Sequence, residues 1–300
     1  MTASVAANRR GMVALTFAMA AYATNDTFVK LVARDLPFGE VIFLRGILSV
    51  LVLLVALWIS GGIRSLKPAF QRDVMWRAFF DAAGTACFIA ALVNMNIAEL
   101  SAMVLTSPLI LTAMAAILLG NPVGWRRWCA ILVGLIGTLF IVKPSAGSFD
   151  AWALVALGAA FLSAGRDLAT RRIDAAIPSL AVSVYGALAV TIVGAMIGTV
   201  ETWTAPTSTH WIGITIAAMF LGVGTYLAVI AFRGVDIPVV APFRYTLLLW
   251  MGISGYVAFD ETPDGWSLFG AALIALSGLY ALHREAVTRR EIADRALPPA

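Results

Sequence analysis

Long apolar runs separated by short polar connections fill most of the chain. A run of about 20 mostly apolar residues can cross a bilayer as one helix. We expect ten such helices, over residues 12–33, 38–59, 73–96, 99–119, 126–143, 150–170, 178–199, 209–231, 237–257 and 265–283. Proline and glycine mark the connections, which are too short to hold a soluble domain. The pattern predicts an all-α membrane protein with ten transmembrane helices.

The composition agrees with a membrane location and argues against a soluble enzyme. The 300 residues are 61% hydrophobic and 13% charged, whereas about a quarter of an ordinary soluble domain is charged. Cys87 and Cys129 lie in apolar runs without a metal-ligand spacing, and the sequence contains no phosphate-binding glycine loop and no HExxH motif. We expect no cofactor, no metal site and no enzymatic activity.

Lysine and arginine set the expected orientation, because the cytoplasmic segments of membrane proteins carry an excess of them. With the N-terminus inside, fifteen Lys and Arg residues fall on inside segments and three on outside ends. Residues 1–11 and 284–300 are then cytoplasmic, and we expect a protein of the bacterial inner membrane. The net charge of +4 follows from this asymmetry, so the sequence predicts no nucleic-acid partner.

The two halves of the chain resemble each other. GTACFIAALVNMNIAELSAMVLTSPLILTAMAAILLG, from Gly84, aligns with GVGTYLAVIAFRGVDIPVVAPFRYTLLLWMGISGYVA, from Gly222, at an offset of 138 residues. We therefore expect two repeats of five helices each, over 12–143 and 150–283. Because five is an odd number, the second repeat enters the membrane inverted, an arrangement that is frequent in transporters.

Polar side chains inside the first two expected helices mark a candidate site. The stretch AYATNDTFVK places Tyr22, Asn25 and Asp26 on one helix face, with Lys30 one turn higher. Arg45, seven residues into the second helix, lies at the depth of Asp26, about 10 Å below the outer surface. A charge at membrane depth is costly unless it is paired. We expect Asp26 and Arg45 to pair, either as an outer gate or only to lock two helices together.

The second repeat supplies a matching polar layer near the inner surface. Arg166 and Asp167 lie in the inner half of the sixth helix, and Arg244 lies about 10 Å into the ninth. The residues between the two layers are mostly apolar. This predicts two gates around a central cavity, although Arg166 and Asp167 can equally form a structural pair.

Prolines, aromatic residues and small polar residues complete the set of candidates. Pro108 interrupts the fourth expected helix and Pro242 the ninth, so each is expected to kink its helix or to line the cavity. Further cavity candidates, whose alternative role is packing, are Phe88, Met103, Thr106, Ser107, Tyr226 and Tyr245.

These features resemble the EamA-type branch of the drug/metabolite transporter superfamily over nearly the whole chain. AAYATNDTFVKLVARDLPFGEVIFLRGILSVLVLL is similar to the family's opening pattern, and the resemblance carries over Asn25, Lys30 and Arg45. The family often has an acidic residue after the fourth helix, where this chain has Asn121, while the second repeat keeps Glu261. The resemblance implies an alternating-access carrier whose first, third, fourth, sixth, eighth and ninth helices enclose the central site.

We expect a secondary transporter that exports small metabolites, foremost amino acids with broad specificity, across the inner membrane. It would act as a monomer in the lipid bilayer on a small-molecule substrate. A multidrug or nucleotide-sugar carrier is the alternative within transport. A membrane accessory subunit or an enzyme is the alternative from another class.

Overall fold

The computed structural model describes residues 5–119, 125–142, 151–170, 172–174, 176–231 and 240–296. Over these residues the protein is built of helices and contains no strand. The long helices are α1 (Val5–Val32), α2 (Phe38–Ile59), α4 (Arg72–Asn94), α7 (Trp125–Val142), α8 (Ala151–Thr170), α9 (Ser179–Gly198), α10 (Ser208–Ala231) and α13 (Gly265–Ala296). The shorter helices are η1 (Ile63–Ser65), α3 (Leu66–Ala69), α5 (Ile97–Val104), α6 (Ser107–Leu119), η2 (Ala241–Tyr245) and α12 (Thr246–Phe259).

Six helical segments of the described chain are long and apolar enough to cross a membrane. They are α2, α4, the α5–α6 segment, α8, α9 and most of α10, and shorter apolar stretches lie at Trp128–Ile141 and Gly265–Ala281. Helix α1 falls short because polar residues, among them Asn25 and Asp26, lower its hydropathy, and α12 because it has only 14 residues. The chain is a multi-span membrane protein, whereas its division into ten spans stays a prediction.

The outermost helices are longer than the expected spans. Helix α1 begins at Val5 and α13 ends at Ala296, so parts of the expected terminal segments 1–11 and 284–300 continue these helices. A helix can extend past its apolar run because charged side chains beyond that run reach the hydrated headgroup region. The first residues of the expected span 237–257 lie outside the described part of the chain.

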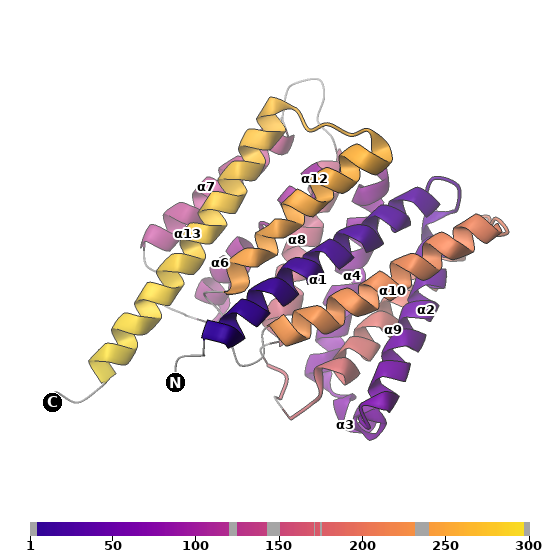
Figure 1. Cartoon of the computed structure of the whole chain (residues 1–300), viewed down its shortest axis with the longest axis horizontal. Coiled ribbons are helices and arrows are strands. Elements are labelled where there is room, and N and C mark those ends of the chain that lie inside the picture. Colours follow the sequence, from indigo (N-terminus) through magenta and orange to yellow (C-terminus); the bar gives the residue numbers. More distant parts are fainter. Residues whose placement is uncertain are drawn as a thin grey trace.

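The two halves of the chain pack against each other helix by helix. Helix α1 packs on α10, α2 on α9, α4 on α8 and α7 on α13. Figure 1 shows α1 (indigo) beside α10 (orange), and α7 beside α13 (yellow). Every one of these pairs takes one helix from residues 5–142 and one from residues 151–296, so neither half forms a separate bundle.

The helix ends define two ends of the bundle. At one of them, here called the Lys30 end, α1 ends at Val32 and α2 begins at Phe38. At the other, here called the Arg166 end, α4 begins at Arg72 and α8 ends at Thr170. The first turn of α1 and the last turn of α13 lie at this same end in Figure 1. The distribution of arginine predicts that the Arg166 end is the cytoplasmic one.

A break divides the fourth expected span into two helices. Helix α5 ends at Val104, and α6 begins at Ser107, with Pro108 as its second residue. The first N–H groups of a helix have no partner within the helix, so a proline there costs no hydrogen bond. Pro108 therefore starts a helix instead of kinking one. Pro242 has the same place in the first turn of η2.

Candidate functional site

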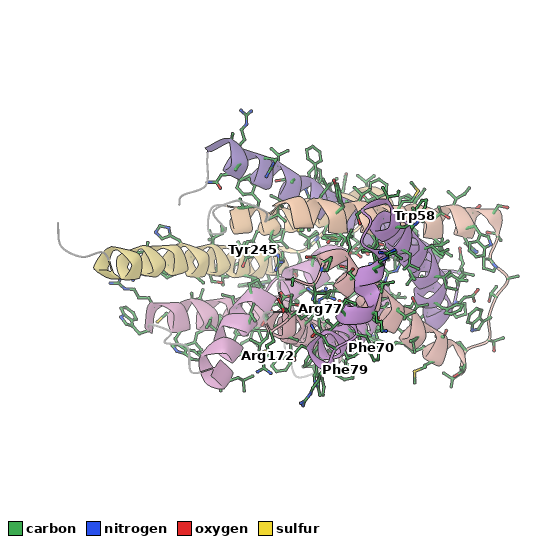
Figure 2. The ribbon with its side chains drawn as sticks, turned by 90° about the horizontal axis from the view of Figure 1, so that it is seen from below. Trp58, Phe70, Arg77, Phe79, Arg172 and Tyr245 are labelled. Atoms are coloured by element: carbon green, nitrogen blue, oxygen red, sulfur yellow. The ribbon has the colours of Figure 1, made fainter. Side chains whose placement is uncertain are left out.

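A cavity of about 500 Å³ lies inside the bundle, among residues of both halves. Helices α1, α2, α4, α8, α9 and α10 supply most of its walls, and the α5–α6 break and the η2–α12 junction supply the rest. Figure 2 shows Arg77 of α4 in the interior of the bundle, whereas Phe79, two residues further on, lies at its surface. The polar and charged side chains that line the cavity include Tyr22, Asn25, Asp26, Arg45, Arg77, Asp81, Arg166, Asp167 and Arg244.

The first polar group in the cavity joins α1 to α2 through an asparagine. The Nδ2 atom of Asn25 donates to Oδ1 of Asp26 at 2.7 Å, and the Oδ1 atom of Asn25 accepts from Nη1 of Arg45 at 3.3 Å. Both Asn25 and Arg45 are buried. Over the described residues, this bridge through Asn25 stands in place of the direct pair that we expected between Asp26 and Arg45. The two charges are therefore held near each other by a neutral residue that bonds to both.

The second polar group joins α4, α8 and η2 in a chain of charges. The Nη1 atom of Arg166 lies 3.1 Å from Oδ1 of Asp81, and its Nη2 atom lies 3.1 Å from Oδ1 of Asp167. At the two ends of the chain, Arg77 lies 3.6 Å from Asp81 and Arg244 lies 3.9 Å from Asp167. The expected cluster of Arg166, Asp167 and Arg244 thus forms, and it extends into the first repeat.

Arg45, which is buried, and Arg77, which is partly buried, each have buried donor atoms that make no hydrogen bond in the described structure. These donors are Nε of Arg45 and both Nε and Nη1 of Arg77, although Nη1 of Arg77 still lies within ion-pair distance of Asp81. Burying a donor atom of a charged group costs free energy when that atom makes no hydrogen bond. The cavity as a whole is lined by four arginines and three aspartates, which leaves an excess of one positive charge. Both observations favour a ligand that carries an anionic group.

The structure separates the apolar and small polar candidates into lining and packing residues. Phe88 and Ser107 line the cavity. Tyr226 does not, because its side chain is turned outward and is 60% exposed. Met103 and Thr106 are fully buried in the packed interior around the α5–α6 break, where the Thr106 hydroxyl donates to the Met103 carbonyl at 2.6 Å.

Tyr245 also lies outside the cavity, because its ring packs against Gly278 of α13. The Oη atom of Tyr245 is buried and has no hydrogen-bond partner among the described residues. Asn121, the counterpart of Glu261 in the first repeat, lies outside the described residues.

Sequence reasoning missed Asp81, and it counted Arg77 only as one of the fifteen positive charges expected on inside segments. Both residues face the cavity from α4 and are four positions apart, which is the spacing of an ion pair on one helix face. A charged pair at that spacing inside an apolar span could have indicated a site from the sequence alone. Their contact with Arg166, 85 residues away from Asp81, needs the packing of α4 on α8 and has no local signature.

Lys30 lies outside the cavity and joins the two halves at the Lys30 end. Its Nζ atom lies 2.5 Å from Oε1 of Glu261 and donates to the Met95 carbonyl at 2.7 Å. The other carboxylate oxygen of Glu261 accepts from the backbone N–H of Ile97 at 2.9 Å. The ring of Phe259 lies below the Lys30 ammonium, 4.9 Å from it. Lys30 and Glu261 together therefore join the end of α1 to the end of α4 and the start of α5.

More hydrogen bonds between the halves close the Lys30 end. They run from the Gly39 N–H to Glu201 at 2.8 Å, from the Thr204 N–H to Glu40 at 3.0 Å and from the Ser267 hydroxyl to Glu99 at 2.6 Å. Toward the Arg166 end, by contrast, Arg166 and Arg244 are partly exposed, whereas Arg45, deeper in the cavity, is buried. Polar contacts between the halves thus close the Lys30 end, and the partly exposed charges of the cavity lie toward the Arg166 end.

Comparison with known proteins places this geometry in a group of transporters. The model of the EamA-like transporter family matches residues 9–143 and again residues 150–282. The chain is 26% identical to the S-adenosylmethionine uptake transporter of Rickettsia bellii, over 87% of this chain and 89% of that protein. It is 28% identical to the riboflavin transporter of Vibrio cholerae, over 81% and 82%, and 24% identical to the pseudopaline exporter of Pseudomonas aeruginosa, over 90% and 94%.

The fold also has a match among solved structures. One crystal structure superposes with a TM-score of 0.62 and covers 92% of this chain and 96% of its own, at 20% sequence identity. At that identity the likeness shows the fold alone. The two matches to the family model together span most of the chain, and the related proteins are transporters and not enzymes. The chain therefore belongs to the EamA-like transporter family.

Proposed function

We propose that this protein is an alternating-access carrier that exports small metabolites with an α-amino-acid group across the bacterial inner membrane. The observation that carries the proposal is that Arg45 and Arg77, which line the cavity, have buried donor atoms that make no hydrogen bond among the described residues. A substrate carboxylate would accept hydrogen bonds from these donors and remove the cost of leaving them unpaired. Charge-assisted hydrogen bonds of this kind are among the stronger polar contacts in proteins.

The other parts of such a substrate also have matching groups. Asp26 and Asp81 offer carboxylates to an ammonium group, and both line the same cavity as the arginines. Tyr22, Phe80 and Phe88 line it as well and offer aromatic surface to an apolar side chain. A cavity with a few charged groups and a broad apolar wall fits several amino acids, which supports a wide specificity.

Closure of the Lys30 end, with the partly exposed charges of the cavity toward the Arg166 end, supports a state that is open at the Arg166 end, one of the two that alternating access requires. If the Arg166 end is cytoplasmic, as the arginine distribution predicts, this is the state in which an exporter takes up its substrate. Breaking the Lys30–Glu261 pair and closing the Arg166 end would release the substrate outside. The relatives include an exporter and an uptake transporter, so the export direction is a separate part of the proposal.

The decisive experiment measures transport by the purified protein alone. The protein is reconstituted into liposomes and tested for uptake of labelled leucine, phenylalanine and glutamate, with riboflavin and a nucleotide sugar as competing classes. We expect saturable uptake of several amino acids. Comparison with and without a pH gradient shows whether protons drive the transport.

A pair of variants ties the uptake to the cavity. Arg45→Gln should lower kcat/KM about thirtyfold, which corresponds to the loss of about 2 kcal/mol from a charge-assisted contact. Arg64→Gln removes the same charge from an exposed position in η1 and should have no effect. Folded protein that transports none of the amino acids would overturn the proposed substrate class, and uptake of riboflavin or the nucleotide sugar would replace it.

A further inference from the structure

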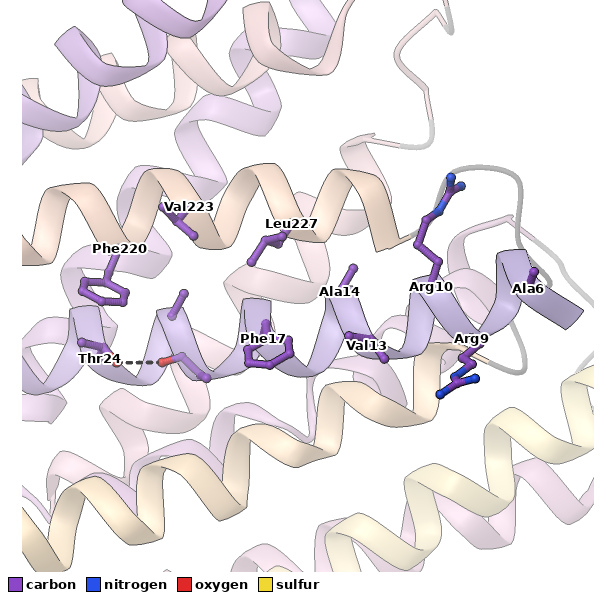
Figure 3. A pocket seen from close by; sticks show the side chains of 12 residues that line it. Ala6, Arg9, Arg10, Val13, Ala14, Phe17, Thr24, Phe220, Val223 and Leu227 are labelled. Atoms are coloured by element: carbon purple, nitrogen blue, oxygen red, sulfur yellow. Dashed lines mark hydrogen bonds between the residues drawn. The ribbon is translucent and has the colours of Figure 1, made fainter.

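An apolar groove runs along the outer face of the bundle between α1 and α10. Its volume is about 1040 Å³, and Figure 3 shows its side chains along both helices. Val13 and Phe17 of α1 and Phe220 and Val223 of α10 line it, and all four are exposed. Among the described residues that line the groove, Thr24 alone has a hydroxyl, and it donates to the Ala20 carbonyl at 3.0 Å. The Thr24 hydroxyl therefore already has its hydrogen-bond partner within α1.

Positive charge gathers at one end of this groove. Arg9 and Arg10 line it near the start of α1, and both are exposed. In Figure 3 the two arginines lie at the end marked by Ala6, and Phe220 lies at the opposite end. The groove is thus amphipathic along its length, with a cationic end and an apolar body. This charge distribution complements a ligand with an anionic head and a long apolar tail.

The dimensions match a lipid in one leaflet of the bilayer. Fourteen residues separate Arg10 from Thr24, which is about 21 Å along a helix. Half of a hydrocarbon core is about 15 Å thick, so a headgroup at the arginines leaves room for an acyl chain along the apolar body. The groove faces outward from the bundle, where the bilayer supplies such molecules. Basic sites beside transmembrane helices are known to bind anionic headgroups.

The same two helices separate the groove from the solute cavity. On α1, Phe17 faces the groove whereas Tyr22 faces the cavity. On α10, Val223 faces the groove whereas Thr225 faces the cavity. A molecule in the groove therefore touches both helices of the α1–α10 pair that forms one wall of the transport path.

We propose that this groove binds one anionic phospholipid, with its phosphate at Arg9 and Arg10 and an acyl chain against Val13, Phe17 and Val223. The site is separate from the cavity proposed for the solute. It gives the two arginines a ligand in addition to their part in setting the orientation of the chain.

Binding is tested on the whole protein, without reference to transport. Detergent-purified protein is titrated with phosphatidylglycerol, and bound lipid is counted by native mass spectrometry while thermal unfolding is followed in parallel. The double variant Arg9→Gln/Arg10→Gln should bind on the order of thirtyfold more weakly. The matched control Arg64→Gln/Arg72→Gln removes two exposed arginines outside the groove and should bind as the unmodified protein does.

Two more arms separate the headgroup from the acyl chain. Phosphatidylcholine, which has no net charge, and water-soluble glycerol phosphate, which has no acyl chain, should both bind much more weakly than phosphatidylglycerol. Ala20→Phe, which places a ring in the groove, should lower binding of phosphatidylglycerol while leaving both arginines in place. Equal binding by the Arg9→Gln/Arg10→Gln variant, or equal binding of phosphatidylcholine, would overturn the proposal, and so would glycerol phosphate binding as tightly as the lipid.

Discussion

The Nζ atom of Lys30 lies 2.5 Å from Oε1 of Glu261, so the first helix of the chain is ion-paired to the connection before its last helix. Both side chains are largely shielded from solvent, and the backbone at Met95 and Ile97 supplies further hydrogen bonds. Removing one partner of such a pair costs free energy, because the other charge stays buried without a counter-charge. The pair therefore favours the closed form of the Lys30 end.

Removing the charge of Glu261 should open the Lys30 end. In Glu261→Gln the Lys30 ammonium loses its counter-charge, which we expect to cost the closed form about 3 kcal/mol. A cysteine at Ala23 reports the change, because Ala23 is 1% exposed and lies about 10 Å below Lys30 on the same helix face. In a protein freed of Cys87 and Cys129, an impermeant maleimide applied from the Lys30 side should label it much faster.

The neighbouring residue Asp260 provides the control for that experiment. Asp260 is exposed and has a left-handed backbone conformation with φ 56°, which asparagine also adopts readily. Asp260→Asn therefore removes one negative charge next to Glu261 without strain and should leave labelling at Ala23 unchanged. Equal labelling of the two variants would show that the Lys30–Glu261 pair does not hold this end closed.

The bridge made by Asn25 should contribute to stability. In Asn25→Leu, Asp26 and Arg45 each lose a hydrogen bond, and a hydrogen bond to a charged group contributes about 1.5–3 kcal/mol. We expect a clear fall in Tm, measured by thermal unfolding in detergent. Thr24→Val, on the other face of α1, removes only a bond to the backbone of its own helix and should change Tm little. An unchanged Tm for Asn25→Leu would contradict a structural role for the bridge.

A methyl group at Gly224 should reduce the space for large substrates. A Cβ atom added there would lie 2.9 Å from Cε1 and 3.0 Å from Cδ1 of the Tyr22 ring, so the ring must move within the cavity wall. We expect KM for phenylalanine to rise about tenfold, as for a core residue that is overpacked by 1–3 kcal/mol, and KM for alanine to change less.

The control for Gly224→Ala is Gly158→Ala, because nothing lies within 4 Å of a Cβ atom added at Gly158. Both variants add the same methyl group to a transmembrane helix. If both change KM for phenylalanine equally, the position of the Tyr22 ring does not limit substrate size.

Asp81 should influence which charges the cavity accepts. Asp81→Asn keeps the shape of the side chain but deprives Arg166 and Arg77 of a counter-charge, so the excess positive charge of the cavity rises from one to two. We expect the ratio of kcat/KM for glutamate over leucine to rise about tenfold, equivalent to 1.4 kcal/mol.

Asp73→Asn, two turns earlier on α4 and outside the cavity, is the matched charge control for Asp81→Asn. It should leave the ratio of glutamate to leucine transport as it is in the unmodified protein. A ratio that is unchanged in both variants would mean that Asp81 does not contribute to charge selection.

The hydrophobic pattern predicts most of the helices, because a segment buried in lipid must be an apolar run of known length. A helix suits such a segment because its backbone groups make their hydrogen bonds within the helix. The pattern places the ends of α2 at 38 and 59, where the structure has Phe38 and Ile59. It fails at the α5–α6 break, because the pattern stays apolar there and Pro108 marks the break only indirectly. It also fails to show that α12 is short, since Arg244 is the single charged residue between 237 and 257 and does not interrupt the apolar run.

The sequence predicts the site only through two properties of each residue, its depth in the membrane and the helix face on which it lies. Asn25, Asp26, Arg45, Arg166, Asp167 and Arg244 do line one cavity. The partner of Lys30 could not be deduced, because Glu261 lies 231 residues away and its position depends on how α1 meets the α12–α13 connection. The outward direction of Tyr226 likewise depends on the rotation of α10, which an almost uniformly apolar helix does not reveal.

The pairing of α1 with α10, α2 with α9, α4 with α8 and α7 with α13 has a consequence for the origin of the chain. One half by itself would leave one face of each of these helices uncovered, so each half depends on the other for its packing. Because both halves match the same family model and cover each other's helices, they resemble two subunits joined into a single polypeptide. Within one polypeptide the two halves can differ in sequence, and Glu261, unlike its counterpart Asn121, has a charged side chain, which makes the ionic contact at the Lys30 end.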